Sequence, residues 1–159
     1  MPSAGEWPRA RSAAYMLDGV LCEAPPPSWN SYTAMRRAER LARRQELLTH
    51  YRNAMPVWDP GEPMFHVFTT RRDDAAVRQA TALWLARHFP RRVRAVTYIP
   101  FAPSVSAAAL LRAAALARCG AREYTEAAPG ILTRLVPAAP GVRLWYFDGE
   151  QRRPGLQNP

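Results

Sequence analysis

The chain has 159 residues, of which 48% are hydrophobic, so it suits one domain with a buried core. No apolar run approaches 18 residues, so we expect no membrane-spanning helix. All 22 basic residues are arginine, which excludes enzymes that need a Schiff-base or phosphate-loop lysine, and the net charge of +9 favours acidic partners.

Residues 1–33 are rich in proline, with three consecutive prolines at 25–27, and they show neither helical nor strand periodicity. We predict an extended arm. This segment also carries large apolar side chains, which a solvated linker would lack. We therefore expect the arm to lie on a neighbouring protein. The expected contact residues in the arm are Trp7, Tyr15, Trp29 and Tyr32.

Residues 33–52 have the apolar spacing of an amphipathic helix, with Ser31 or Thr33 as its N-cap. Its polar face carries five arginines: Arg36, Arg37, Arg40, Arg43 and Arg44. Only Glu39 and Glu46 can pair with them within the helix, so positive charge is in surplus. The surplus predicts an anionic counter-surface, which acidic protein, anionic lipid head groups or RNA would provide.

A proline-rich connector at 53–63 precedes an alternation of strands and helices. We predict three strands, at 64–70, 93–99 and 142–147. A helix capped by Asp73 and ending near His88 lies between the first two strands. A second helix, capped by Ser104, follows the second strand and ends near Cys119, with Gly120 as its C-cap. The apolar run 131–136 fits either a helix or a strand. Asp148-Gly149 predicts a hairpin turn. Strands joined through helices predict right-handed parallel crossovers.

The residues that can carry chemistry form no catalytic or metal-binding pattern. The histidines lie in different predicted elements, without the spacing of metal ligands: His50, His66 and His88. Asp73 and Asp74 follow a predicted strand, and helix capping explains them without a catalytic role. We therefore expect a protein that is not an enzyme, with no metal site and no cofactor.

Residues 140–150, PGVRLWYFDGE, resemble the stretch of thioredoxin-like proteins in which a cis-proline precedes an apolar strand and a hairpin. The strand and helix order between residues 64 and 119 is similar to that fold too. The resemblance implies that Pro140 is the cis-proline and Asp148-Gly149 the hairpin turn. Where the family has redox cysteines, this chain has TRRDD at 70–74, which excludes thiol–disulfide exchange.

We thus predict an α/β fold: a small thioredoxin-like βαβαβ sheet domain at 64–150. An extended arm at 1–33 and an arginine-rich helix with its connector at 34–63 precede it, and a tail at 151–159 follows. Redox-inactive domains of this type occur in accessory subunits of mitochondrial complexes. The resemblance therefore implies a non-catalytic structural subunit of a mitochondrial respiratory-chain or ATP-synthase complex, in or facing the matrix. Its partners would be neighbouring protein subunits and anionic lipid. An RNA-binding mitochondrial ribosomal protein is the alternative.

Overall fold

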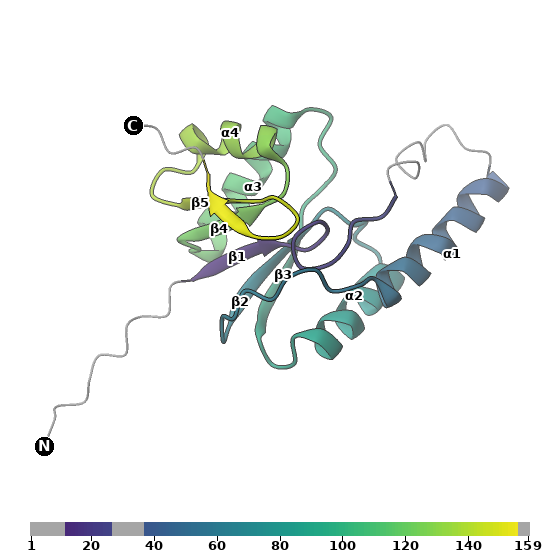
Figure 1. Cartoon of the computed structure of the whole chain (residues 1–159). Coiled ribbons are helices and arrows are strands. Elements are labelled where there is room, and N and C mark those ends of the chain that lie inside the picture. The colour runs from purple at the N-terminus through teal and green to yellow at the C-terminus, as the bar shows by residue number, and fades with distance from the viewer. Residues whose placement is uncertain (1–11, 27–36, 156–159) are drawn as a thin grey trace, which may run out of the picture.

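The computed structural model describes residues 12–26 and 37–155. Its elements are β1 (Ala13–Met16), α1 (Arg37–Asn53), β2 (Phe65–Thr69), α2 (Ala75–His88), β3 (Val93–Tyr98), α3 (Val105–Cys119), β4 (Glu123–Glu126), α4 (Pro129–Ala138), β5 (Arg143–Phe147) and β6 (Arg152–Pro154). They build an α/β fold, which confirms the α/β part of the prediction, while the thioredoxin-like part stays a prediction (Figure 1). Within the described ranges, no helix has both the length and the apolar character needed to cross a membrane.

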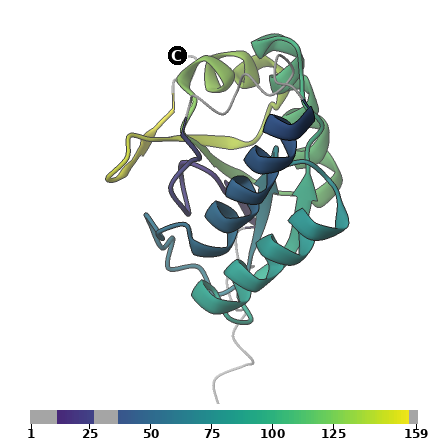
Figure 2. The same ribbon diagram turned by 90° about the vertical axis from the view of Figure 1, so that its right-hand side faces the viewer.

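The six strands form one sheet in the order β3-β2-β1-β4-β5-β6. Strands β1 to β5 pair in parallel, and β6 runs antiparallel to β5. The first described strand, β1, lies in the centre; the chain then builds outward through β2 and β3 and crosses to β4 on the other side of β1. Helices α3 and α4 cover one face of the sheet, α2 covers the other, and α1 packs beside α2 (Figures 1 and 2).

The central strand β1 comes from the segment that we predicted to be an extended arm, so that prediction is wrong for residues 12–26. Tyr15 is only 1% exposed, and its ring packs edge-on against Trp58 and Phe65 at centroid distances of 5.7 and 5.3 Å. Tyr15 is therefore a core residue of this chain and not a partner contact. A strand buried on both faces is apolar without alternation, which is the pattern between the two proline-rich stretches.

Of the predicted helix caps, Ser104 is confirmed and Asp73 is wrong by one residue, while Ser31 and Thr33 lie outside the described residues. Asp74, not Asp73, caps α2, since its side chain accepts a hydrogen bond from the Val77 backbone N–H at 3.1 Å. Ser104 caps α3 through the Ala107 N–H at 3.1 Å, as predicted. Gly120 ends α3 with a left-handed φ of 67°, a backbone conformation that glycine adopts without steric cost.

The last third of the chain differs from the prediction in three places. The ambiguous run 131–136 lies inside α4, and β4 lies in a stretch for which we predicted no element. Asp148-Gly149 forms the predicted turn, which leads from β5 into β6 within the predicted tail. The expectation that Pro140 is a cis-proline is wrong: the peptide bond before it is trans, like every peptide bond among the described residues.

Candidate functional site

The carboxyl ends of β1, β2 and β4 meet at one edge of the sheet. Open α/β sheets bind ligands outside this edge, at the point where the strand order reverses. In this chain the reversal falls beside β1, since β2 lies on one side of it and β4 on the other. The described groups at this edge form two buried ion-pair networks and one pocket.

The first network joins the ends of β1 and β2. Arg71 follows β2 and donates from Nε and Nη2 to the two carboxylate oxygens of Asp18, at 3.0 and 2.7 Å. Its Nη1 donates to the Thr81 hydroxyl at 3.0 Å, and its guanidinium carbon lies 3.9 Å from the centre of the Tyr51 ring. Burial alone would lower the pKa of Arg71, but the Asp18 carboxylate outweighs it and raises that pKa.

Cys22 and Tyr51 border this network and stay uncharged. The Cys22 thiol lies 3.4 Å from an Asp18 carboxylate oxygen, and burial together with that charge raises its pKa far above the usual range. Burial and Asp18 also raise the pKa of Tyr51 to about 12. A thiol that stays protonated is a poor nucleophile, so Cys22 does not have the environment of a reactive cysteine.

The second network joins α3 to β4. Glu126 accepts hydrogen bonds from Arg112 Nε at 2.7 Å and from the Tyr124 hydroxyl at 2.8 Å. The side chains of Arg112 and Glu126 are only 7% and 4% exposed. Glu126 also accepts from the backbone N–H groups of Ala127 and Ala128, which lead into α4. Burial opposes the charge on Arg112, but its two partners outweigh this and raise its pKa.

Both networks hold their charged groups in fixed pairs. General acid–base catalysis needs a group that can gain or lose a proton near neutral pH, and the raised pKa values of Arg71 and Arg112 lie further from that range. No cluster of three or more possible metal ligands occurs among the described residues. Sequence reasoning missed the four paired residues, whose only signal is a charge set beside an apolar run: Asp18, Arg71, Arg112 and Glu126.

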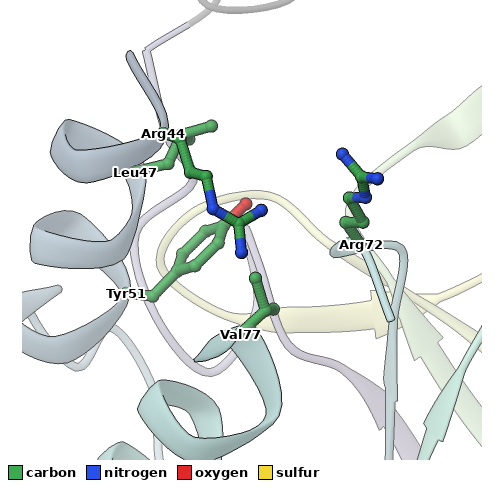
Figure 3. Close-up of a pocket in the computed structure, with 5 residues that line it drawn as sticks. All are labelled: Arg44, Leu47, Tyr51, Arg72 and Val77. Atoms are coloured by element: carbon green, nitrogen blue, oxygen red, sulfur yellow. The ribbon is translucent and has the colours of Figure 1, made fainter. Parts of the chain in front are cut away.

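The pocket lies between α1, α2 and the loop that follows β2, next to the first network (Figure 3). Its volume is about 180 Å³. Five residues line it: Arg44, Leu47, Tyr51, Arg72 and Val77. The Tyr51 ring connects the pocket to the buried network, because the same ring lies against the Arg71 guanidinium.

The arginines predicted to face a partner are only partly described. Arg43 pairs with Glu46 at 2.6 Å, as the helix spacing predicted. Arg44 donates from both Nη atoms to Asp74 at 2.9 and 3.1 Å, so its charge holds α1 against α2. Arg37 and Arg40 lie in α1, but their side chains are outside the described set. The remaining predicted contacts, in residues 1–11 and 27–36, also fall outside it: Trp7, Trp29, Tyr32 and Arg36.

A row of buried polar atoms crosses the centre of the sheet. Tyr15, Thr125 and Trp145 stand opposite one another on β1, β4 and β5. The Tyr15 hydroxyl, the Thr125 hydroxyl and the Trp145 indole N–H are all buried without a hydrogen-bond partner. Arg152 covers this row, with its guanidinium carbon 4.2 Å from the centre of the Trp145 ring. Ordered water commonly satisfies such groups.

Comparison of the chain with protein-family models, with curated proteins and with solved structures finds no match. Two features of the described residues bear on function. One is the pair of buried ion pairs at the carboxyl ends of the strands, and the other is helix α1, whose Leu41 is exposed.

Proposed function

We propose that this protein is a non-catalytic structural subunit that binds an acidic surface of a partner protein through the first half of α1. The observation that carries the proposal is that α1 is longer than the surface it packs against. Leu48 and Tyr51, in its second half, are buried against Val77 and Ala80 of α2. Leu41, in its first half, is 58% exposed.

We call residues 37–43 the projecting half of α1, because Arg44, the next residue, already donates to Asp74 at the start of α2. Figure 1 shows this end of the helix pointing away from the sheet and from α2. A helical segment of about seven residues is marginal in water without tertiary packing. Covering the exposed part of Leu41, which is 58% of its surface, would add about 1–2 kcal/mol. The projecting half is therefore a segment whose stability would increase on binding.

The positive charge of α1 indicates that the partner surface is acidic. Residues 36–46 hold five arginines and two glutamates. Complementary charge speeds association and selects the partner, which supports an acidic protein surface as the counterpart. The buried ion pairs Asp18–Arg71 and Arg112–Glu126 support a structural role over a catalytic one. The first joins the ends of β1 and β2, and the second joins α3 to β4.

The proposed setting is the one that the sequence resemblance implied, a mitochondrial respiratory-chain or ATP-synthase complex. Its support is the resemblance and the basic charge alone. Anionic lipid next to the partner subunit would meet the same arginines. RNA is the competing counterpart, and the experiment below separates it from protein.

The test compares the wild-type protein with Leu41→Asp and with a matched control, Leu110→Asp. Leu110 is 63% exposed on α3, on the other side of the sheet from α1, so both changes place a new charge on an exposed leucine. Exposed substitutions of this kind usually change stability by less than about 0.5 kcal/mol. Matching thermal unfolding curves would show that both variants fold.

Each protein is purified gently from its native source with a tag and sized on a native gel. We expect the wild type and Leu110→Asp to migrate in a large assembly, and Leu41→Asp to migrate as the free chain. Retention of Leu41→Asp in the assembly would refute the proposed contact. Release of the wild type by ribonuclease, with salt-dependent rebinding to RNA, would replace the protein partner with RNA.

A further inference from the structure

The pocket between α1 and α2 has apolar walls and a rim of hydrogen-bond donors. Leu47, Val77 and the ring of Tyr51 form the walls. Arg44 and Arg72 stand on opposite sides of the opening, with Tyr51 and Val77 between them (Figure 3). The polar groups that line it are two guanidinium groups and one phenol, so a ligand has to supply the acceptors.

Arg72 is the rim group best placed to hold an anion. Its side chain is 72% exposed, and its Nε lies 3.8 Å from Asp74 Oδ2, which is too long for a hydrogen bond. Asp74 is already occupied, because it accepts both hydrogen bonds from Arg44 and one from the Val77 backbone N–H. Arg44 offsets the negative charge of Asp74, and Arg72 keeps only a long ion pair with that carboxylate, so its hydrogen-bond donors can hold a second anion.

The chemistry of the ligand follows from the rim and the walls together. The planar fork of a guanidinium matches a carboxylate, which it can hold by two parallel hydrogen bonds. The apolar walls favour a compact hydrocarbon group next to that carboxylate. An apolar cavity of about 150 Å³ holds one benzene ring. The pocket, at about 180 Å³, therefore has room for one ring or a short branched chain.

We propose that the pocket between α1 and α2 binds a carboxylate attached to a single compact apolar group, with Arg72 holding the carboxylate and Leu47, Tyr51 and Val77 enclosing the apolar part. A free monocarboxylic acid and the last residue of a peptide both present this chemistry. The inference stands apart from the proposed partner contact, since the residues that carry it lie in the packed half of α1, in α2 and in the loop after β2.

The test uses protein with labelled leucine and valine methyl groups and follows the signals of Leu47 and Val77 by NMR. The ligand is benzoate, and benzyl alcohol serves as the uncharged analogue of the same shape. We expect benzoate to shift both signals saturably and benzyl alcohol to bind at least tenfold more weakly. Charge-assisted hydrogen bonds make a difference of about this size.

Two variants locate the carboxylate. Arg72→Ala should weaken benzoate binding about two- to fivefold, which is the effect expected when an exposed ion pair is lost. Arg118→Ala removes an exposed arginine from α3 and should leave the affinity unchanged. Arg72 is largely exposed, so we expect its variant to fold, and an unchanged amide spectrum away from the pocket would confirm this.

A tetrapeptide that ends in phenylalanine, with its carboxylate free or amidated, distinguishes the two sources of the ligand. Tighter binding of the free peptide than of benzoate would identify a peptide C-terminus, and weaker binding would identify a free acid. The proposal is overturned if benzoate leaves the Leu47 and Val77 signals unchanged. It is also overturned if benzyl alcohol binds as well as benzoate, or if Arg72→Ala retains full affinity.

Discussion

Replacing Glu126 with glutamine tests whether the carboxyl edge is held together by its buried ion pairs. The change keeps the size of the side chain and removes its charge. It leaves the Arg112 guanidinium buried, with a neutral amide where the carboxylate accepted its hydrogen bond at 2.7 Å. It also weakens the acceptor of the Tyr124 hydroxyl.

Breaking a buried ion pair by removing one partner costs about 3–5 kcal/mol, because the other charge stays buried without compensation. The low exposure of both side chains, 7% for Arg112 and 4% for Glu126, places this pair in that class. A whole domain has a stability of only about 5–15 kcal/mol. Glu126→Gln should therefore remove a large part of the free energy of unfolding.

The measurement is urea unfolding followed by tryptophan fluorescence, with equal slopes required for all variants. The matched control is Asp73→Asn, whose ion pair with Arg78 has both side chains more than half exposed, and whose loss should be barely measurable. Adding Arg112→Met to Glu126→Gln should recover stability, because no unpaired buried charge remains. A Glu126→Gln midpoint equal to that of the wild type would refute the reasoning.

Three further predictions test other parts of the fold. Tyr15→Phe should leave the free energy of unfolding within about 1 kcal/mol of wild type or raise it, since the buried hydroxyl lacks a partner. Tyr124→Phe should lower it by about 1–2 kcal/mol in the same urea assay, because the Tyr124 hydroxyl donates to Glu126. Burial lowers the pKa of His66, so the folded state favours the neutral ring. The free energy of unfolding should be highest above pH about 6.5 and fall as the pH drops below that value. His66→Gln should remove this pH dependence in unfolding curves recorded at several pH values. Asp74→Ala should cost about 1–2 kcal/mol by thermal unfolding, through the lost cap of α2 and the lost contact with Arg44; an unchanged melting curve would contradict this.

Local signals explain what the sequence predicted well. The helices α2 and α3 begin at residues whose side chains accept from their first turns, and α3 ends at a glycine in the left-handed region. These features depend on neighbours within four residues, so they can be read directly from the chain. The strands β2, β3 and β5 were visible for a similar reason, because each is an uninterrupted run of strand-forming residues.

The central strand β1 and the strand β4 needed information that the local sequence lacks. Prolines on both sides of β1 hid a short apolar strand, while β4 reads EYTE and resembles a polar loop. Its glutamates are buried because arginines from distant elements reach them: Glu126 pairs with Arg112, and Glu123 lies 3.7 Å from Arg143. The pair Asp18–Arg71 spans 53 positions and depends on the parallel pairing of β1 with β2.

Hydrogen exchange along α1 tests the central claim most directly. In the isolated chain, backbone amides of residues 44–53 should exchange slowly, because this half packs on α2 and Arg44 bonds Asp74. Those of residues 37–43 should exchange close to the rate of an open helix. In the native assembly, the projecting half should become as protected as the packed half. Equal protection of both halves in the isolated monomer, with no change on assembly, would contradict a partner contact at α1.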